Sequence, residues 1–317
     1  MAVLKNVFIC MTPLQTLIAE KIIEKETINK AESILLYIGT IDNQINRAYF
    51  QRLASGFKYS EFLQTGRSLR TVFRMRQLLY GKSYKIYVAG IDDSLIHYAI
   101  SFLKKPELYT FDDGTANIMP QSTYFTGVKR PFIREYLLRF AHFLLGKRFN
   151  LEKTKSSTIK HYSIYNGFPN AATAEIEYLS LFTTKNTVSA NKKNIKVFLG
   201  TVYDEATRTK DDADFLWKNV QEFLKENGED IIYIQHPREK RAYGCSSNDR
   251  RIAEEIILDL RKSYATVDLY GFGSSTQFNL VNVEGINVIP VYSELLLDEV
   301  NSTLSVLKDR THDQLNI

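Results

Sequence analysis

The sequence predicts an α/β fold built from two Rossmann-like domains. Three observations support this: short apolar runs of strand length alternate with segments of helical periodicity, the alternation comes in two series, and a polar stretch separates them. Continuous apolar strands that alternate with helices are typical of parallel sheets covered on both faces. We therefore expect an N-terminal domain over residues 1–155, a linker over 156–192 and a C-terminal domain over 193–317.

The first series opens with an apolar strand over residues 7–10 and a helix that begins at Pro13. Proline is favoured in the first turn of a helix, and Leu14, Leu17 and Ile18 then recur at helical spacing. The rest of the series predicts strands at 33–38, 85–89 and 107–111, helices at 46–55 and 94–104, and an aromatic and basic helix from Arg130 to about Leu145.

The second series follows the polar stretch. In chain order it predicts strands at 195–199, 230–235, 266–270 and 287–292, and helices at 211–227, 248–263 and 274–281. Ligands of open α/β sheets bind outside the carboxyl ends of the strands. Polar residues that directly follow a predicted strand therefore receive most weight as candidate site residues.

Composition excludes several classes of protein. The 317 residues are 44% hydrophobic, which is enough for two cores, and the net charge of +5 suits anionic small molecules or a lipid surface better than nucleic acid. Cys10 and Cys245 resemble neither a disulfide framework nor a zinc site, which favours a reducing compartment. The N-terminus resembles a buried strand rather than a signal peptide, and no apolar run is long enough to span a bilayer, so we expect a cytoplasmic protein.

Two adjacent carboxylates, Asp112 and Asp113, precede Gly114 and follow the strand that ends at Phe111. Such a pair can hold a metal ion, or it can form an Asx turn and cap a helix. No further carboxylate at ligand spacing supports the first interpretation, so we expect no metal.

Asp204 lies shortly after the first strand of the second series, in the segment Gly200-Thr201-Val202-Tyr203-Asp204. Gly200 would let a ligand approach the backbone, and the carboxylate of Asp204 could accept a proton from a hydroxyl group. The alternative is an ordinary acid in a surface loop.

His236 follows the next strand and precedes Pro237 and Arg238. Proline fixes the turn, and imidazole with a nearby guanidinium can donate hydrogen bonds to a phosphate that gains charge. A histidine with a purely structural role in the turn is the competing interpretation.

Ser274 and Ser275 stand at the start of a predicted helix, after Gly271-Phe272-Gly273. Hydroxyl groups and free backbone N–H groups at a helix N-terminus form an anion site. An ordinary serine N-cap explains the same residues.

The helix over 130–148 combines bulky apolar residues with arginine and lysine. It could lie on an anionic membrane surface, or pack on its own domain or on a twin subunit.

These segments together resemble the bacterial sialyltransferases of glycosyltransferase family 52. The resemblance covers most of the chain and follows the order of the family's motifs. They are Asn6 to Gln15, Phe111-Asp112-Asp113-Gly114-Thr115-Ala116-Asn117, His161 to Tyr165, Leu199 to Asp204, and His236-Pro237-Arg238.

The resemblance implies a GT-B-type fold, in which two Rossmann-like domains face a cleft, and an inverting, metal-independent transfer of sialic acid from CMP-sialic acid. The N-terminal domain would serve the acceptor, a galactose-terminated glycan or lipid-linked oligosaccharide of the bacterial surface or capsule. It further implies Asp204 as general base and His236 as the group that stabilises the departing phosphate. Donor contacts would come from Gly200, Thr201, Pro237, Arg238, Ser274 and Ser275, with Gln15, Asp112, Asp113 and Gly114 on the acceptor side or structural. It also implies no cofactor and a homodimer.

Two alternatives remain open in the sequence, namely a transferase for another nucleotide sugar and a non-catalytic subunit that docks on glycans or membranes. The linkage, to the 3- or the 6-hydroxyl, also remains open. The N-terminal anchor of some relatives is missing from the sequence, so we expect a soluble or peripherally attached enzyme.

Overall fold

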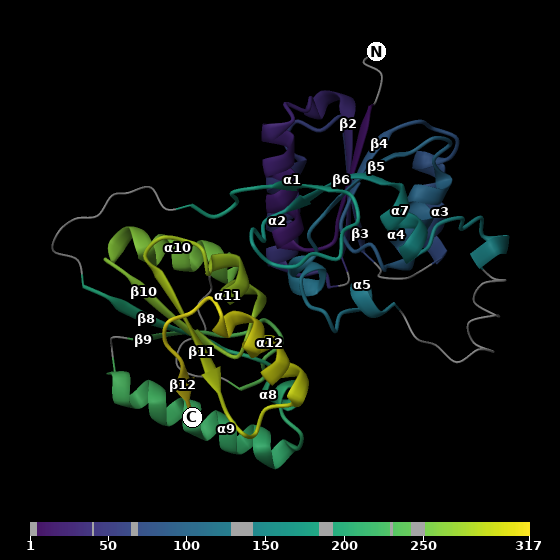
Figure 1. Ribbon diagram of the computed structural model, residues 1–317. Helices are drawn as coiled ribbons and strands as arrows, with labels where there is room; N and C mark the ends of the chain where they lie inside the picture. The colour runs from purple at the N-terminus through teal and green to yellow at the C-terminus, as the bar shows by residue number, and fades with distance from the viewer. Residues whose placement is uncertain are drawn as a thin grey trace. The chain divides into compact units, whose positions relative to one another are not determined.

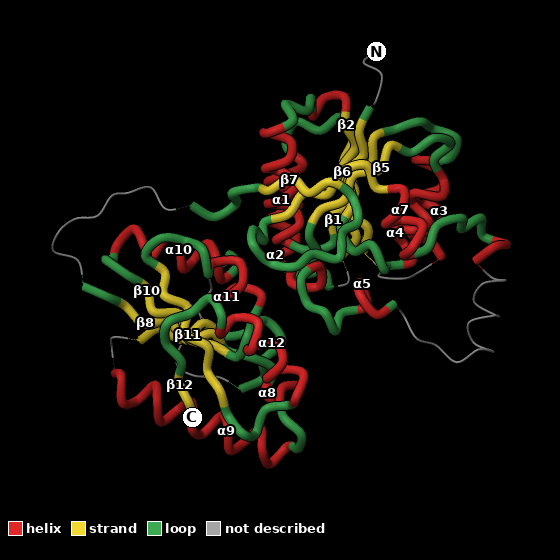
Figure 2. The backbone as a smooth tube through the Cα atoms, viewed as in Figure 1, coloured by secondary structure: helices red, strands yellow, loops and turns green. Residues whose placement is uncertain are grey.

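The computed structural model describes residues 5–39, 41–64, 69–127, 142–183, 193–228, 231–241 and 251–317. The chain divides into two compact units, Met1–Leu181 and Phe182–Ile317. Each has its own parallel sheet with helices on both faces (Figures 1 and 2).

The N-terminal unit contains seven parallel strands in the order β3-β2-β1-β4-β5-β6-β7. The strands are β1 (Asn6–Cys10), β2 (Ser33–Gly39), β3 (Tyr59–Gln64), β4 (Lys85–Val88), β5 (Glu107–Phe111), β6 (Thr158–Ser163) and β7 (Glu175–Tyr178). The described helices are α1 (Pro13–Lys25), α2 (Gln44–Ala54), α3 (Leu69–Leu79), α4 (Ser94–Phe102), α5 (Thr123–Thr126) and α7 (Leu151–Ser157), with 3-10 turns η1 (Lys30–Glu32) and η2 (Gly114–Asn117).

Alternate residues of each strand enter two separate cores. Val7 and Ile9 of β1 pack with α3 and α4 on one face, whereas Phe8 and Cys10 pack with α1 and α2 on the other. Successive side chains of a strand point to opposite faces, so a strand covered on both sides must be apolar throughout. The helices accordingly flank the N-terminal sheet on two sides (Figure 2).

The C-terminal unit contains five parallel strands in the order β12-β11-β10-β8-β9. They are β8 (Ile195–Leu199), β9 (Ile231–Ile234), β10 (Val267–Gly271), β11 (Ile286–Tyr292) and β12 (Leu315–Asn316), and the described helices are α8 (Tyr203–Ala206), α9 (Lys210–Asn227), α10 (Ala253–Ser263), α11 (Ser275–Leu280) and α12 (Asp298–Lys308). One core joins the sheet to α9 and α12, and the other joins it to α10 and α11.

The predicted α/β class is confirmed, but the predicted linker over 156–192 is wrong for much of its length. Residues 158–163 and 175–178 form β6 and β7, which extend the first sheet beyond β5. β7 is polar because it lies at the edge of the sheet. β6 can be polar because its buried side chains His161 and Ser163 are hydrogen-bonded to Asp112. The edge strand β3 and the helices α3 and α12 were not predicted.

Candidate functional site

The predicted donor residues all follow strands at the carboxyl edge of the C-terminal sheet. Residues 200–204 follow β8, residues 235–239 follow β9 and residues 272–275 follow β10. Strand order reverses at β8, which lies between β9 and β10. Ligands of open α/β sheets bind at such a reversal, so this edge is the candidate site of the C-terminal unit.

His236 is half-buried and its tautomer is set by the turn that contains it. The backbone N–H of Arg238 donates to Nδ1 of His236 at 3.1 Å, which leaves the proton of the neutral ring on Nε2. Burial lowers the pKa of His236, and the charge of Arg238 lowers it further. The ring is therefore a neutral donor through Nε2–H at neutral pH, which suits an anionic ligand.

Glu239 holds this turn in place and was missed from the sequence. Its carboxylate accepts from the Tyr233 hydroxyl at 2.7 Å and from the backbone N–H of His236 at 3.2 Å, and burial raises its pKa. A Cβ at Gly200 would collide with the Tyr233 hydroxyl and the Glu239 carboxylate, so this packing explains the glycine without any ligand. The available signal was an acid three residues after His236, at the end of a turn closed by the Glu239 N–H to the His236 carbonyl at 2.9 Å.

Asp204 lies in the short helix α8, with its side chain 49% exposed. Arg241 donates to the Asp204 carboxylate at 3.1 Å and also binds Asp214. The hydrogen bond from Arg241 lowers the pKa of Asp204, so the group is ionised at neutral pH and is a weak base.

Arg238 does not present a free guanidinium. It makes a two-pronged ion pair with Glu205, at 2.8 and 2.9 Å. Any contact of Arg238 with a phosphate would have to compete with this carboxylate, which the sequence did not reveal. Pro237 is exposed beside it, and Thr201 is half-buried after β8.

The Ser274 hydroxyl is buried in a capping box, where its oxygen faces the Gln277 backbone N–H, and its O–H has no acceptor among the described residues. The backbone N–H groups of Gly273 and Ser274 are already taken by the Gln277 side-chain oxygen, at 2.9 and 3.2 Å. These two N–H groups therefore cannot serve an anion, contrary to the prediction of free backbone donors. The hydroxyls of Ser274 and Ser275 remain as candidate donors to an anion, and Ser275 is exposed at the first position of α11.

Gln277, which anchors this loop, is fully buried and was not predicted. Its Nε2 donates to the carbonyls of Leu269 and Ile289, at 3.4 and 3.3 Å, and so ties the loop to β10 and β11. Gly273 has a φ of +75°, a conformation that glycine adopts without strain.

The adjacent acids of the N-terminal unit have different surroundings. Asp112 is fully buried and binds His161 Nε2 at 3.0 Å, the Ser163 hydroxyl at 2.8 Å and the backbone N–H of Ile164 at 2.7 Å. Its oxygens join the end of β5 to β6, so Asp112 is a structural residue. His161, to which the sequence gave no role, is its buried partner.

Asp113 lies where β1, β4 and β5 end and strand order reverses between β1 and β4. It accepts hydrogen bonds from the Gln15 side-chain amide and from the Tyr124 hydroxyl, the latter at 3.2 Å. Burial raises its pKa. Gly114, at φ +60°, turns the chain directly after it.

Comparison with known families decides which class of enzyme this site belongs to. The model of glycosyltransferase family 52 matches residues 20–294. This chain belongs to glycosyltransferase family 52. The resemblance stated from the motifs is thereby confirmed, and the protein is a glycosyltransferase.

Curated relatives of this family 52 enzyme include three sialyltransferases. The chain is 28% identical over 285 residues to the CMP-N-acetylneuraminate:beta-galactoside alpha-2,3-sialyltransferase of Pasteurella multocida, covering 87% of each protein. It is 26% identical to an N-acetyllactosaminide alpha-2,3-sialyltransferase of Haemophilus influenzae, over 89% of this chain and 90% of the relative. It is 25% identical to one of Neisseria meningitidis, over 89% and 77%.

Solved structures confirm that the family 52 chain has a GT-B-type fold. A sialyltransferase from Photobacterium damsela aligns with a TM-score of 0.52 at 14% identity, over 100% of this chain and 82% of that one. A putative UDP-N-acetylglucosamine 2-epimerase from Listeria monocytogenes aligns with the same TM-score at 13% identity, over 98% and 88%. At such identities the likeness concerns the fold alone.

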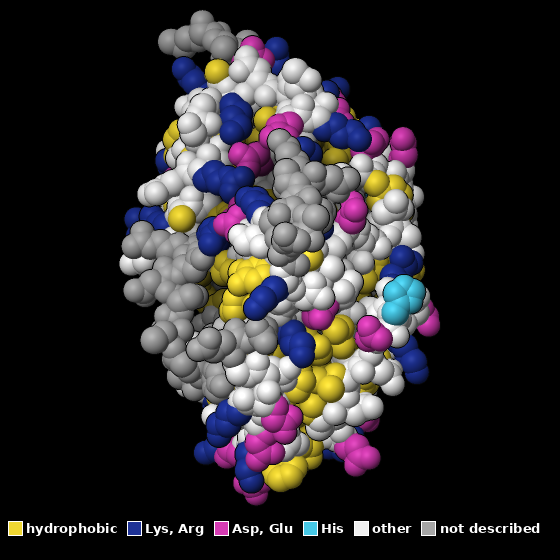
Figure 3. Space-filling model, turned by 90° about the vertical axis from the view of Figure 1, so that its left-hand side faces the viewer, with side chains coloured by type: hydrophobic (Ala, Val, Ile, Leu, Met, Phe, Trp, Pro, Cys, Tyr) yellow, Lys and Arg dark blue, Asp and Glu magenta, His cyan; other side chains and the backbone are white. Residues whose placement is uncertain are grey.

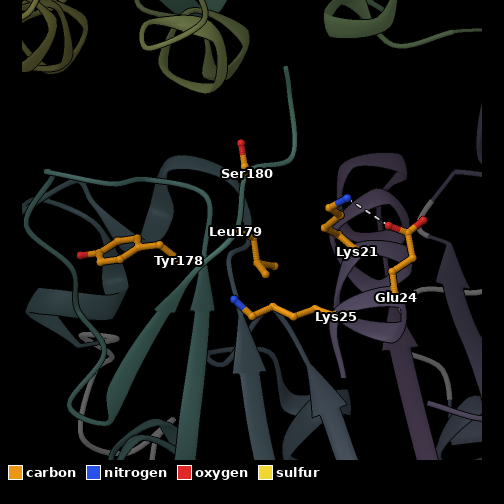
Figure 4. Close-up of a pocket in the computed structure, with 6 residues that line it drawn as sticks. All are labelled: Lys21, Glu24, Lys25, Tyr178, Leu179 and Ser180. Carbon is orange, nitrogen blue, oxygen red and sulfur yellow. Dashed lines mark hydrogen bonds and ion pairs between the residues drawn. The ribbon is translucent and has the colours of Figure 1, made fainter. Parts of the chain in front are cut away.

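A hollow of about 420 Å³ in the N-terminal unit of this family 52 enzyme lies away from the predicted residues (Figure 4). It is lined by Lys21, Glu24 and Lys25 of α1 and by Tyr178, Leu179 and Ser180 at the end of β7. Its lysines already bind acids, since Lys21 contacts Glu24 at 3.0 Å and Lys25 contacts Glu177. We therefore place the candidate site at the strand ends and not in this hollow.

Other predictions concern the surface of the enzyme. The face drawn in Figure 3 mixes acidic and basic side chains rather than carrying one sign of charge. No helix in the described part of the chain is long and apolar enough to cross a membrane, and within the same part no three His, Cys, Asp or Glu residues gather as a metal site. Residues 130–141, which are most of the predicted basic helix, lie outside the described residues.

Proposed function

We propose that this glycosyltransferase moves sialic acid from CMP-sialic acid to the 3-hydroxyl of a terminal galactose on a bacterial surface glycan or its lipid-linked precursor. Three curated relatives named as alpha-2,3-sialyltransferases support the donor, the class of acceptor and the linkage. The observation that carries the proposal is at the C-terminal sheet edge, where His236 offers Nε2–H and the buried Ser274 O–H has no acceptor among the described residues. Neutral donors of this kind suit the single phosphate of CMP.

In the proposed reaction, the acceptor oxygen attacks the anomeric carbon of sialic acid as the bond from that carbon to the phosphate oxygen breaks. The acceptor proton passes to the carboxylate of Asp204, and CMP leaves with the bonding electrons. A single displacement of this kind inverts the anomeric centre. His236 and Ser274 stabilise the charge that develops on the phosphate. Such electrostatic stabilisation of the transition state is usually the largest single contribution of a protein to catalysis.

Asp113 is the proposed acceptor-side carboxylate. Its raised pKa and its hydrogen bonds to Gln15 and Tyr124 suit a group that orients a sugar hydroxyl. The same raised pKa makes Asp113 the second candidate for the general base, because a base works best when its pKa is near the working pH.

Three finer points belong to the same proposal: catalysis needs no metal ion, the enzyme works on the cytoplasmic side of the membrane, and it acts as a homodimer. A monophosphate donor carries less charge than a diphosphate donor, so protein hydrogen bonds can replace a cation. Activity unchanged by EDTA would support the first point, and strong dependence on a divalent ion would contradict it.

The proposal is tested by incubating the purified protein with lactose and either CMP-sialic acid or a UDP-hexose. We expect sialyllactose and CMP only from the first donor, with a 3-linkage in the product. Product from the UDP donor alone would overturn the proposal in favour of another nucleotide sugar. Binding of CMP without product from any galactoside would favour the non-catalytic alternative.

A further inference from the structure

Helix α3 exposes a row of large apolar side chains. Leu69, Phe73 and Tyr80 are 59%, 58% and 63% exposed, and their spacing of four and seven residues puts them on one side of the helix and its end. The opposite side, with Val72 and Met75, is buried in the core of the N-terminal unit. Burial of the domain core therefore does not account for the outer row.

A second exposed apolar pair adjoins α3. Phe143 and Leu144 are 76% and 67% exposed, while the next residue, Leu145, packs against the core that also holds α3 and α4. A Cβ added at Gly146 would lie 4.0 Å from Arg76 of α3, which shows that the two segments are neighbours. Helices α3 and α4 lie on the same side of the sheet (Figure 1).

The charged residues of these two segments have one sign, although Glu61 of β3 pairs with Arg74 of α3 at 2.9 Å. Arg70, Arg76 and Lys82 are exposed among them, and residues 69–85 and 142–148 contain no aspartate or glutamate. Arg76 lies 4.9 Å from the centre of the Tyr80 ring, so cation and aromatic ring form one surface. We call this surface the α3 face, defined by Leu69, Arg70, Phe73, Arg76, Tyr80, Lys82, Phe143 and Leu144.

Another exposed aromatic residue of the molecule has acidic instead of basic neighbours. Phe215 of α9 is 56% exposed and is preceded by Asp211, Asp212 and Asp214. The basic residues beside Phe73 are therefore a property of that surface and not of every exposed phenylalanine in this protein.

We propose that the α3 face binds an anionic phospholipid surface, with its aromatic and aliphatic side chains among the headgroups and its arginines on the phosphates. Apolar side chains surrounded by cations match the chemistry of such a surface. A second copy of the chain fits less well, because a two-fold interface on this face would bring Arg70, Arg76 and Lys82 toward their own counterparts. The inference does not depend on the proposed reaction.

Vesicle sedimentation tests the inference with the full chain. The probes are phosphatidylcholine vesicles with and without about 30% phosphatidylglycerol, a content that gives a marked negative surface potential. We expect the wild type to sediment with the anionic vesicles, weakly with the neutral ones, and less as salt is raised. The double variant Phe73→Ser/Arg76→Glu should bind the anionic vesicles at least about tenfold more weakly.

The matched control is Phe215→Ser/Lys218→Glu, which removes one exposed ring and reverses one exposed charge on α9. It should bind vesicles as the wild type does. Both variants should keep the wild-type circular dichroism spectrum and activity on soluble lactose. Wild type that stays in solution, or a test variant that binds like wild type, would overturn the inference. The inference would also be overturned by a test variant that changes from dimer to monomer in light scattering but keeps its vesicle binding, because the α3 face would then join two copies of the chain.

Discussion

Arg241 divides its guanidinium between Asp204 and Asp214, and this makes the two acids a matched pair for testing catalysis. Both side chains are exposed, and both contact the same guanidinium. Only Asp204 lies directly after β8, in α8. If Asp204 acts in proton transfer, replacing Asp204 should lower turnover and replacing Asp214 should not. If the two acids only fix Arg241, both replacements should have similar effects.

Asp204→Ala should lower turnover by at least about a hundredfold, because the acceptor proton then has no carboxylate to receive it. CMP binding, measured by calorimetry, should change little. Asp214→Ala should retain turnover within a few-fold. If Asp113→Ala abolishes turnover while Asp204→Ala does not, the base is Asp113 and the assignment above is wrong.

The donor role of His236 can be separated from its bulk. His236→Ala should reduce kcat/KM by roughly 10²–10³, the effect of losing one donor to a developing charge. His236→Gln places an N–H near the position of Nε2 and should restore part of that loss. Equal rates for the two variants would show that the N–H is not used.

The pKa of His236 also affects stability. Since burial lowers it below the ordinary value of 6.5, the unfolded chain binds more protons than the folded chain as pH falls through that range. The unfolding free energy that the neutral His236 ring contributes is present above pH 6.5. It is lost as pH falls through the lower pKa of His236 in the folded state. Urea titrations should therefore show a steeper loss of unfolding free energy below about pH 6.5 in the wild type than in His236→Gln.

At the scale of elements, the junction of β8 and β9 depends on the missing side chain of Gly200. The Tyr233 hydroxyl and the Glu239 carboxylate occupy the space where a Cβ would stand. This packing brings the ends of both strands together and positions the turn that carries His236. The glycine therefore acts on the site through packing.

Gly200→Ala should cost about 1–3 kcal/mol of unfolding free energy, the usual penalty of overpacking. In a Tyr233→Phe background the same change should cost less, because the colliding hydroxyl is gone. Chemical denaturation of the four proteins of this cycle measures the coupling. Equal penalties in both backgrounds would show that the hydroxyl is not the obstacle.

Helices and strands were predicted well where one physical signal dominated. The strand 7–10 was found because both faces of β1 are buried, and the helix was found because Pro13 stands in its first turn and Leu17 and Ile18 follow Leu14 at helical spacing. The strands β6 and β7 were taken for a linker because their sequence is polar, and only the sheet shows that Asp112 satisfies the buried groups of β6. The helix α3 was missed because the large exposed residues Leu69 and Phe73 obscure the apolar side that Val72, Met75 and Leu79 form.

At the scale of the whole molecule, the two units have separate cores and separate reporters. The single tryptophan, Trp217, lies in the C-terminal unit, with its ring 5.2 Å from that of Tyr203 and 5.7 Å from that of Tyr233. Its fluorescence therefore follows the unit that carries His236. Far-UV circular dichroism follows both units.

Asp112→Asn should destabilise the N-terminal unit by about 3 kcal/mol, since it weakens a fully buried pair with His161. The circular dichroism transition in urea should move to lower concentration, while the Trp217 transition stays in place. Asp298→Ala, which breaks the exposed pair with Arg208, should shift neither by more than about 0.5 kcal/mol.

Saturation with CMP at about 100 times its Kd should raise the stability followed by Trp217 by roughly 2.7 kcal/mol. A shift confined to the circular dichroism transition would place the nucleotide on the N-terminal unit.

The sequence by itself determined the fold class, the positions of most strands along the chain and the positions where polar residues follow them, because these depend on local periodicity and on turn residues. It also indicated the family, through motifs in a fixed order. The tertiary structure decided which polar groups are available. Asp112 is buried in a pair with His161, whereas the Asp113 carboxylate accepts hydrogen bonds from the neutral Gln15 and Tyr124 side chains. Arg238 is held by Glu205, and the Ser274 O–H has no acceptor among the described residues. Adjacent residues of one motif differ in this way because burial and hydrogen bonding depend on which strands meet, and that is a property of contacts between distant parts of the chain.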